Sequence, residues 1–243
     1  MKFVALKATK PLFFGGMIGV PNEREVFIMK QNITELVFIL DRSGSMAGLE
    51  QDTIGGFNAM IEKQKKLDDP CYVSTFLFDH ESKILHDRVE LKEVKNMTQA
   101  DYAVRGCTAL FDAVGEAISH ISDIHRYIRK EDVPQKTLFV ITTDGMENSS
   151  HSYSREQIQQ MIEAKKELGW EFIFLGANMD AVVTAGGLGI EKSRAVTYHS
   201  DSKGTKCLYR TVSDAVCSVR MGAPLPSSWS DNLKQDYEKR SKK

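Results

Sequence analysis

Short apolar runs alternate with longer segments of helical periodicity along most of this chain. Six runs rich in β-branched and aromatic residues predict strands; they lie at 36–40, 71–78, 83–89, 136–143, 171–175 and 194–198. Five longer segments repeat apolar residues at the spacing of one helix face; they lie at 51–67, 110–128, 154–168, 179–187 and 205–221. Strands that alternate with helices predict an α/β fold, a doubly wound sheet with helices on both faces.

The turn between the second and third predicted strands decides how these two strands pair. Only residues 79–82 join 71–78 to 83–89. A turn this short cannot contain a crossover helix, so the two strands should be antiparallel neighbours, with 83–89 at the edge of the sheet. We therefore predict a mostly parallel six-stranded sheet with one antiparallel edge strand.

Segments of different composition border and interrupt the periodic part of the chain. We interpret 32–222 as one domain and 1–31 as an extension that is either disordered or the product of an upstream start site. Residues 11–20 form a short apolar run, but no small-residue cleavage site follows it, so export is not expected. The segment 223–243 has two prolines, clustered serines and a basic end, which favours a linker-like tail. Residues 90–105 are polar and irregular, and we expect a surface loop there.

Composition narrows the class of protein. The chain has 243 residues, 42% of them hydrophobic and 27% charged, which is typical of a globular protein. Its net charge of −1 gives no reason to expect a nucleic acid or an anionic membrane as partner, and no apolar run is long enough to span a bilayer. The four cysteines form no C-x-x-C pair, which favours reduced thiols in a cytoplasmic protein. We expect Cys107 to be a small buried residue rather than a redox switch.

Polar side chains that suit a metal ion occur at three places in the predicted fold. Asp41, Ser43 and Ser45 follow the first predicted strand in the pattern D-x-S-x-S, so their three oxygen side chains can converge. Thr108 precedes the second predicted helix, and Asp144 lies at the end of a predicted strand, in the segment Ile-Thr-Thr-Asp-Gly (141–145). Ligands of open α/β sheets lie beyond the carboxyl ends of the strands. Oxygen clusters of this kind suit a hard cation such as Mg²⁺.

These three pieces, in this order, resemble the metal-ion-dependent adhesion site, or MIDAS, of von Willebrand factor type A (vWA) domains, over roughly 34–221. The resemblance implies a Rossmann-like vWA fold in which Asp41 and Asp144 are brought together at the point where the winding of the sheet reverses. It also implies that Asp41, Ser43, Ser45, Thr108 and Asp144 hold Mg²⁺ or Mn²⁺.

The charge of these ligands predicts how such a metal would act. Only the two aspartates can offset the charge of a divalent ion, because the other three ligands are neutral hydroxyls, so the ion stays electrophilic at its open position. In vWA domains that position takes a glutamate or aspartate of a partner protein, and the resemblance implies a metal-dependent protein-binding module of the adhesion or scaffold type here. Stand-alone bacterial members often act beside AAA+ ATPases, which suggests a partner in such a system.

Other polar residues near the predicted strand ends have a weaker claim to function. Glu147, Asn148, Asn178 and Asp180 follow strand ends on the same side of the sheet. They are either contacts at the rim of the metal site or solvated loop residues, and the second interpretation is favoured. The six histidines show no H-E-x-x-H spacing, which disfavours zinc.

Two alternative functions compete with a protein-binding module. The first is a Mg²⁺-dependent hydrolase or phosphotransferase on the same scaffold. The chain lacks G-x-x-x-x-G-K-[ST] and G-x-S-x-G loops, and Ser43 stands where aspartyl-phosphate chemistry typically needs a second aspartate, so we expect no enzyme. The second alternative is a metal that only stabilises the fold.

Overall fold

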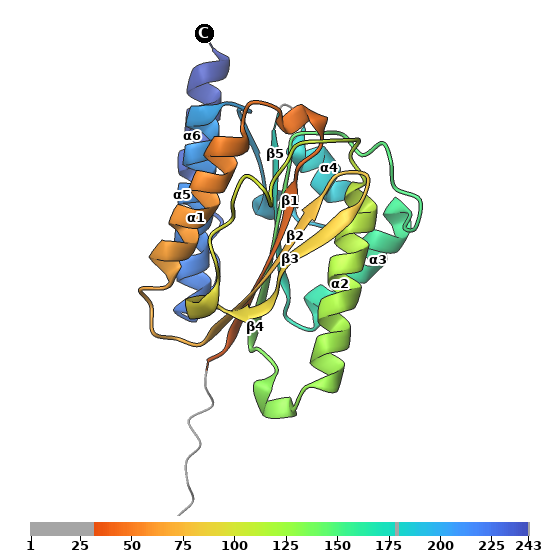
Figure 1. Cartoon of the computed structure of the whole chain (residues 1–243), viewed down its shortest axis with the longest axis vertical. Coiled ribbons are helices and arrows are strands. Elements are labelled where there is room, and N and C mark those ends of the chain that lie inside the picture. Colours follow the sequence, from red (N-terminus) through yellow and green to blue (C-terminus); the bar gives the residue numbers. More distant parts are fainter. Residues whose placement is uncertain (1–31, 178–179, 243) are drawn as a thin grey trace, which may run out of the picture. The chain divides into compact units, whose positions relative to one another are not determined.

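The computed structural model describes residues 32–177 and 180–242, and its centre is a six-stranded sheet in the order β3-β2-β1-β4-β5-β6 (Figure 1). The strands are β1 (Thr34–Asp41), β2 (Cys71–Phe78), β3 (Ser82–Glu90), β4 (Lys136–Thr143), β5 (Glu171–Ala177) and β6 (Ala195–Tyr198). All neighbouring strands are parallel except β2 and β3, which are antiparallel. The predicted mostly parallel sheet with one antiparallel edge strand is therefore confirmed.

Six α-helices cover the sheet within the described residues. They are α1 (Glu50–Gln64), α2 (Leu110–Tyr127), α3 (Arg155–Glu167), α4 (Ala181–Gly187), α5 (Ser202–Arg220) and α6 (Asp231–Ser241). Helices α1, α5 and α6 lie on one face, and α2, α3 and α4 on the other (Figure 1). Each of the five predicted helices is present with shifted ends, and the chain carries a sixth that was not predicted.

The central strand β1 shows why both faces are covered. Every residue of β1 is buried. Because side chains alternate along a strand, Leu36, Phe38 and Leu40 pack with α1 and α5, whereas Val37 and Ile39 pack with α2. A strand that is apolar on both faces suits only the interior of a sheet with helices on each side. This layering places the carboxyl end of β1 at the centre of one end of the sheet.

The expectation of a linker-like tail at 223–243 is wrong, because α6 packs against the domain. Leu225, Trp229 and Leu233 are buried, and the indole Nε1 of Trp229 donates to the backbone oxygen of Ser193 at 2.7 Å. Arg240 binds Asp236 on the same helix at 2.9 Å. Leu225 and Trp229 precede α6 and only Leu233 lies within it, so the mostly charged and polar sequence of α6 carries little helical periodicity.

Two smaller expectations also fail. The segment 90–105 is irregular, but it is not merely a surface loop, because Leu91, Val94, Met97 and Tyr102 are buried. These residues recur at short intervals and pack against the face that carries α1. Cys107 is exposed rather than buried, although all four cysteines are free, as expected.

The predicted extension 1–31 lies outside the described residues. The described residues from 32 to 242 belong to one compact unit. Among the described helices, none is long and apolar enough to cross a membrane.

The buried position of Leu233 generates a test of α6. Leu233 is 1% exposed, so Leu233→Ala should lower the free energy of unfolding by about 2–4 kcal/mol through lost burial and a cavity. The matched control is Leu168→Ala, at a leucine that is 71% exposed, for which we expect a change within about 0.5 kcal/mol. Urea denaturation measures both. Equal, small effects would show that α6 does not pack on the domain.

Candidate metal centre

The two predicted acidic ligands follow the two neighbouring central strands of the sheet. Asp41 is the last residue of β1, and Asp144 directly follows β4. Strands β1 and β4 pair in parallel, with Leu40 opposite Thr142. The chain winds outward from this pair in both directions, since β2 lies beyond β1 and β5 lies beyond β4. The carboxylates therefore lie at the topological switch point, where open α/β sheets bind ligands.

The Asp41 carboxylate is held in place by two hydrogen bonds. One oxygen, Oδ1, accepts from the backbone N–H of Ser43 at 2.7 Å, and Oδ2 accepts from the hydroxyl of Thr143 at 2.6 Å. Burial raises the pKa of Asp41, and these hydrogen bonds oppose that effect, while the nearby Asp144 raises the pKa further. Asp41 is thus a buried carboxylate whose charged form would gain from a cation.

The three hydroxyl residues come together from two loops. The Ser43 and Ser45 hydroxyls are 3.0 Å apart. A methyl group built on Gly145 would lie 2.6 Å from the Thr108 hydroxyl oxygen and 3.2 Å from that of Ser45. The residue after Asp144 therefore abuts both hydroxyls, and only a glycine leaves them room. The structure brings all five predicted ligands to one place.

One oxygen of Asp144 lacks a partner. Its Oδ2 accepts from the hydroxyl of Ser200 at 3.1 Å, but its Oδ1 is buried and has no hydrogen-bond partner among the described residues. A buried carboxylate oxygen without a partner destabilises the folded state, because it has lost its hydrogen bonds to water and has no protein donor in their place. A cation beside Asp144 would remove that cost.

The donor set fits a hard divalent cation. All five side chains offer oxygen, and two of them are carboxylates, which is the ligand type that Mg²⁺, Mn²⁺ and Ca²⁺ prefer. Asp41, Ser43, Ser45, Thr108 and Asp144 would hold the ion, which would supply positive charge and a coordination position for an external oxygen.

Backbone contacts fix the loops that carry these ligands. The N–H of Gly44 donates to the backbone oxygen of Gly106 at 3.1 Å, and the N–H of Arg105 donates to that of Arg42 at 2.9 Å. Gly106 has φ +66°, a conformation that favours glycine. A buried ion pair between Arg42 and Asp79, at 2.8 Å, connects the loop after β1 to the residue that follows β2. The loop after β1 and the loop before α2 are thus joined independently of any metal.

The predicted rim residues have structural contacts of their own. Glu147 accepts from the N–H groups of Phe111, Ser149 and Ser150. Asn148 accepts from the N–H of Thr108 at 2.9 Å and so positions that predicted ligand. Asp180 accepts from the N–H of Val183 and caps α4. Asn178 lies outside the described residues.

Sequence reasoning missed several residues that support the ligands. Thr143 binds Asp41, Ser200 binds Asp144, and the Tyr102 hydroxyl donates to the backbone oxygen of Asp41. Thr143 could have been suspected, since it precedes Asp144 at the strand end. Ser200 and Tyr102 are distant in sequence, and no local pattern connects them to the site.

Two other places were candidates for a ligand site. Asp79, His80 and Glu81 lie close enough together to hold a metal, but Arg105 binds Asp79 at 2.9 Å and Glu81 at 2.8 Å, so the positive charge is already supplied.

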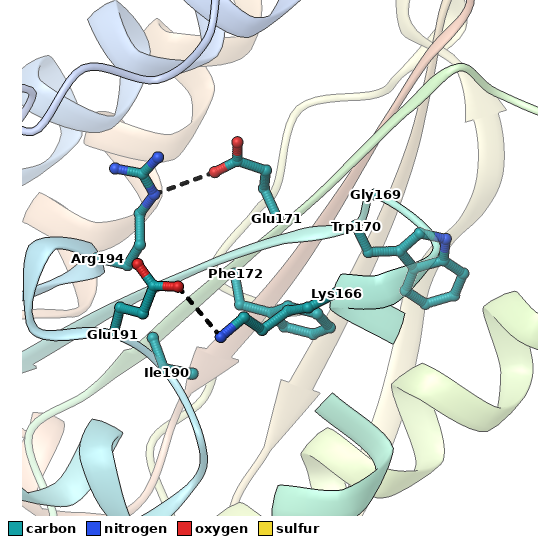
Figure 2. Close-up of a pocket in the computed structure, with 8 residues that line it drawn as sticks. All are labelled: Lys166, Gly169, Trp170, Glu171, Phe172, Ile190, Glu191 and Arg194. Atoms are coloured by element: carbon teal, nitrogen blue, oxygen red, sulfur yellow. Dashed lines mark hydrogen bonds and ion pairs between the residues drawn. The ribbon is translucent and has the colours of Figure 1, made fainter. Parts of the chain in front are cut away.

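The second is a hollow of about 220 Å³ beside the start of β5 (Figure 2). Its charged groups pair with each other, as Lys166 lies 3.4 Å from Glu191 and Arg194 lies 3.1 Å from Glu171 (Figure 2). Neither place offers an unsatisfied charged group to a ligand.

Comparison with known proteins agrees with this geometry. Residues 33–185 match a family model, vWA-TerF-like, described as the vWA found in the TerF C terminus. Among curated proteins, none matches the chain significantly.

Solved structures share the fold. The vWF domain of the pilus tip protein Mfa5 from Porphyromonas gingivalis has a TM-score of 0.57 at 9% identity, covering 80% of this chain and 97% of that one. A D319A mutant of the PilB minor pilin from Streptococcus sanguinis has a TM-score of 0.54 at 11% identity, and the match covers 82% of this chain and 63% of the pilin. Proximal thread matrix protein 1 from the mussel byssus, with a zinc-occupied MIDAS motif, has a TM-score of 0.53 at 13% identity, and the match covers 77% of this chain and 46% of that protein. The chain thus spans less than two thirds of the last two proteins.

The raised pKa of Asp41 predicts how neutralising this residue affects the metal-free protein. A raised pKa means that the folded state binds the proton more tightly than the unfolded chain does. The contribution of Asp41 to stability is therefore complete below the unfolded pKa and is lost as pH rises through the folded pKa. After chelation, Asp41→Asn should raise the melting temperature near neutral pH, with a smaller gain in mild acid.

The control is Asp214→Asn, at an exposed aspartate that pairs with Lys63 on the surface. It should shift the free energy of unfolding by no more than about 1 kcal/mol. A melting temperature for Asp41→Asn that falls equally at both pH values would show that burial does not disfavour the carboxylate.

Proposed function

The chain belongs to the vWA-TerF-like family, whose model matches residues 33–185, and from this premise we propose that it is a divalent-metal-dependent protein-binding module. The ion is Mg²⁺ or Mn²⁺, held by Asp41, Ser43, Ser45, Thr108 and Asp144. Its function is to bind an acidic residue of a partner protein.

The unpaired Oδ1 of Asp144 is the observation that carries this proposal. It lies at the switch point of the sheet, buried and without a hydrogen-bond partner among the described residues. The hydroxyls of Ser45 and Thr108 are close together there, against Gly145. A site built only from oxygen groups, with one carboxylate oxygen unsatisfied, is best explained by a cation.

The ligand charges explain why the module would bind an acid. The two carboxylates balance the charge of a divalent ion without exceeding it, and the other three ligands are neutral hydroxyls. An ion with a free coordination position therefore stays electrophilic and attracts a further carboxylate. A glutamate or aspartate of another protein supplies one. The zinc-occupied MIDAS motif of the mussel byssus protein supports a metal at this place in the fold.

The alternative of a Mg²⁺-dependent hydrolase or phosphotransferase has less support. The Ser43 and Ser45 hydroxyls bond to each other. His80 lies against Gly106 and pairs with Asp79 at 3.0 Å. None of the described contacts joins the Ser43, Ser45 or Thr108 hydroxyl to a histidine, the base that most often activates a hydroxyl nucleophile. The proposal therefore assigns the protein no enzymatic activity.

The cellular setting follows only from the family resemblance. Stand-alone members suggest a cytoplasmic protein whose partner belongs to an AAA+ ATPase system. We propose the same setting for this chain.

Metal binding should stabilise the protein directly. An ion present at about 100 times its dissociation constant adds about 2.7 kcal/mol to the free energy of unfolding. Chelator-treated protein should therefore melt roughly 5–10 °C higher when Mg²⁺ or Mn²⁺ is added. Differential scanning fluorimetry measures the shift. Identical melting curves with and without either ion would contradict the proposed site.

Gly145→Ala offers a sharper test of where the ion binds. The added methyl would lie 2.6 Å from the Thr108 hydroxyl oxygen, so that ligand must move. We expect Mg²⁺ affinity, measured by calorimetry, to fall at least about tenfold, which is about 1.4 kcal/mol. The matched control is Gly186→Ala in α4, where nothing lies within 4 Å of the added methyl. Equal Mg²⁺ affinity in both variants would place the ion elsewhere.

Partner binding should depend on the same ion. Affinity capture from the source cell, in Mg²⁺ and in chelator, should recover a protein only with Mg²⁺. Thr108→Ala should keep its fold, as judged by circular dichroism, and lose the capture, because it removes one ligand. If Thr108→Ala captures the same protein as wild type, the metal only stabilises the fold. Turnover of phosphate ester, ATP or peptide substrates that Asp41→Ala abolishes would instead favour the enzyme.

A further inference from the structure

Two exposed apolar side chains lie close to the metal centre. Met146 is 74% exposed and Val183 is 69% exposed, which places them among the few large apolar residues that the described part of the chain leaves in solvent. Both line the same hollow. Scattered single apolar residues on a surface are common, but two around one hollow suggest a contact with another molecule.

The hollow lies between the loop after β4, the start of α2, and α4. Its lining includes Phe111, Met146, Glu147, Arg155, Val183 and Thr184, and its volume is about 190 Å³. An apolar cavity of about 150 Å³ accepts a benzene ring, whereas sites for drug-sized molecules measure about 300–1,000 Å³. The hollow is thus sized for one bulky apolar side chain.

Its position ties the hollow to the metal centre. Met146 follows Asp144 by two residues, so their Cα atoms are at most about 7 Å apart. In an extended peptide, residues two apart point to the same side and lie about 6.6–6.8 Å apart. The predicted ligand Asp144 and the lining residue Met146 are thus about as close as two residues two apart in an extended peptide, so one such peptide can reach both the metal and the hollow.

The charges at the rim favour an acidic peptide. The Glu147 carboxylate is occupied by three backbone N–H groups and the Ser150 hydroxyl. Arg155 has a 61% exposed side chain and lies 3.8 Å from its neighbour Glu156, a distance too long for a strong ion pair. The rim thus presents an available cation and a carboxylate that is already satisfied.

We infer that the partner presents an extended segment with an acidic residue and, two positions away, a bulky apolar residue such as Leu, Met or Phe. The acid binds the metal and the apolar side chain fills the hollow between Phe111, Met146 and Val183. This inference rests on the proposed function, since it describes the partner of the same site.

A peptide library tests it. A phage-displayed library with a fixed glutamate and randomised neighbours is selected on the full chain in Mg²⁺ and, in parallel, in chelator. We expect Mg²⁺-dependent enrichment of bulky apolar residues two positions from the glutamate. An enriched synthetic peptide should bind about tenfold or more tightly than its version with alanine at that position, as measured by fluorescence polarisation.

Variants locate the contact. Val183→Ser should abolish the apolar preference while leaving the Mg²⁺-induced melting shift unchanged, and Met146→Ser serves as the second variant should Val183→Ser fail to fold. The matched control is Leu168→Ser, at a leucine that is equally exposed at 71% and lies outside the hollow; it should retain the preference.

The outcomes separate this inference from the proposed function. Mg²⁺-dependent binding of glutamate peptides without an apolar preference overturns the inference and leaves the proposed function standing. An apolar preference that persists in chelator also overturns it, because the hollow then acts alone. Failure to select any Mg²⁺-dependent glutamate peptide overturns both.

Discussion

The candidate metal site depends on two carboxylates that meet at the carboxyl ends of adjacent parallel strands. Asp41 ends β1 and Asp144 follows β4, and the pairing of these central strands forces the two acids together. Like charges in a buried place repel each other, and each raises the cost of the other. The proximity of Asp144 contributes to the raised pKa of Asp41, and one oxygen of Asp144 has no hydrogen-bond partner among the described residues. A cation bound between Asp41 and Asp144 would offset their mutual repulsion and the cost of burying them.

The surrounding residues keep that arrangement ready before any ion arrives. Thr143 and the backbone of Ser43 orient Asp41, and Ser200 orients Asp144. Asn148 fixes the backbone of Thr108. Since these contacts hold the ligands in place, little ordering remains to oppose binding, which favours affinity. Under the proposed function, the stability of the metal-free protein and its affinity for metal are opposed at Asp41, as stability and function often are at functional sites.

Most of the fold could be predicted because its signals are local. The apolar run ending at Leu40 indicated a central strand, and the short turn at 79–82 indicated the antiparallel edge. The five candidate ligands were found because each follows a strand or precedes a helix. Local patterns could not reveal contacts that only the fold creates, such as the one between Ser200 and Asp144. Helix α6 was missed for a different reason. Leu233 is its only buried residue, so the helix has almost no apolar period, and its packing against α5 and β6 arises only in the fold.

The central claim is that five oxygen ligands enclose one divalent ion between β1 and β4. Anomalous diffraction from crystals grown with Mn²⁺ tests it most directly. We predict a single strong peak at the switch point. The Mn²⁺ at that peak should be coordinated by the side chains of Asp41, Ser43, Ser45, Thr108 and Asp144, each directly or through a water molecule. A crystal saturated with Mn²⁺ that shows no peak there, or a peak bound only by Asp79, His80 and Glu81, would contradict it.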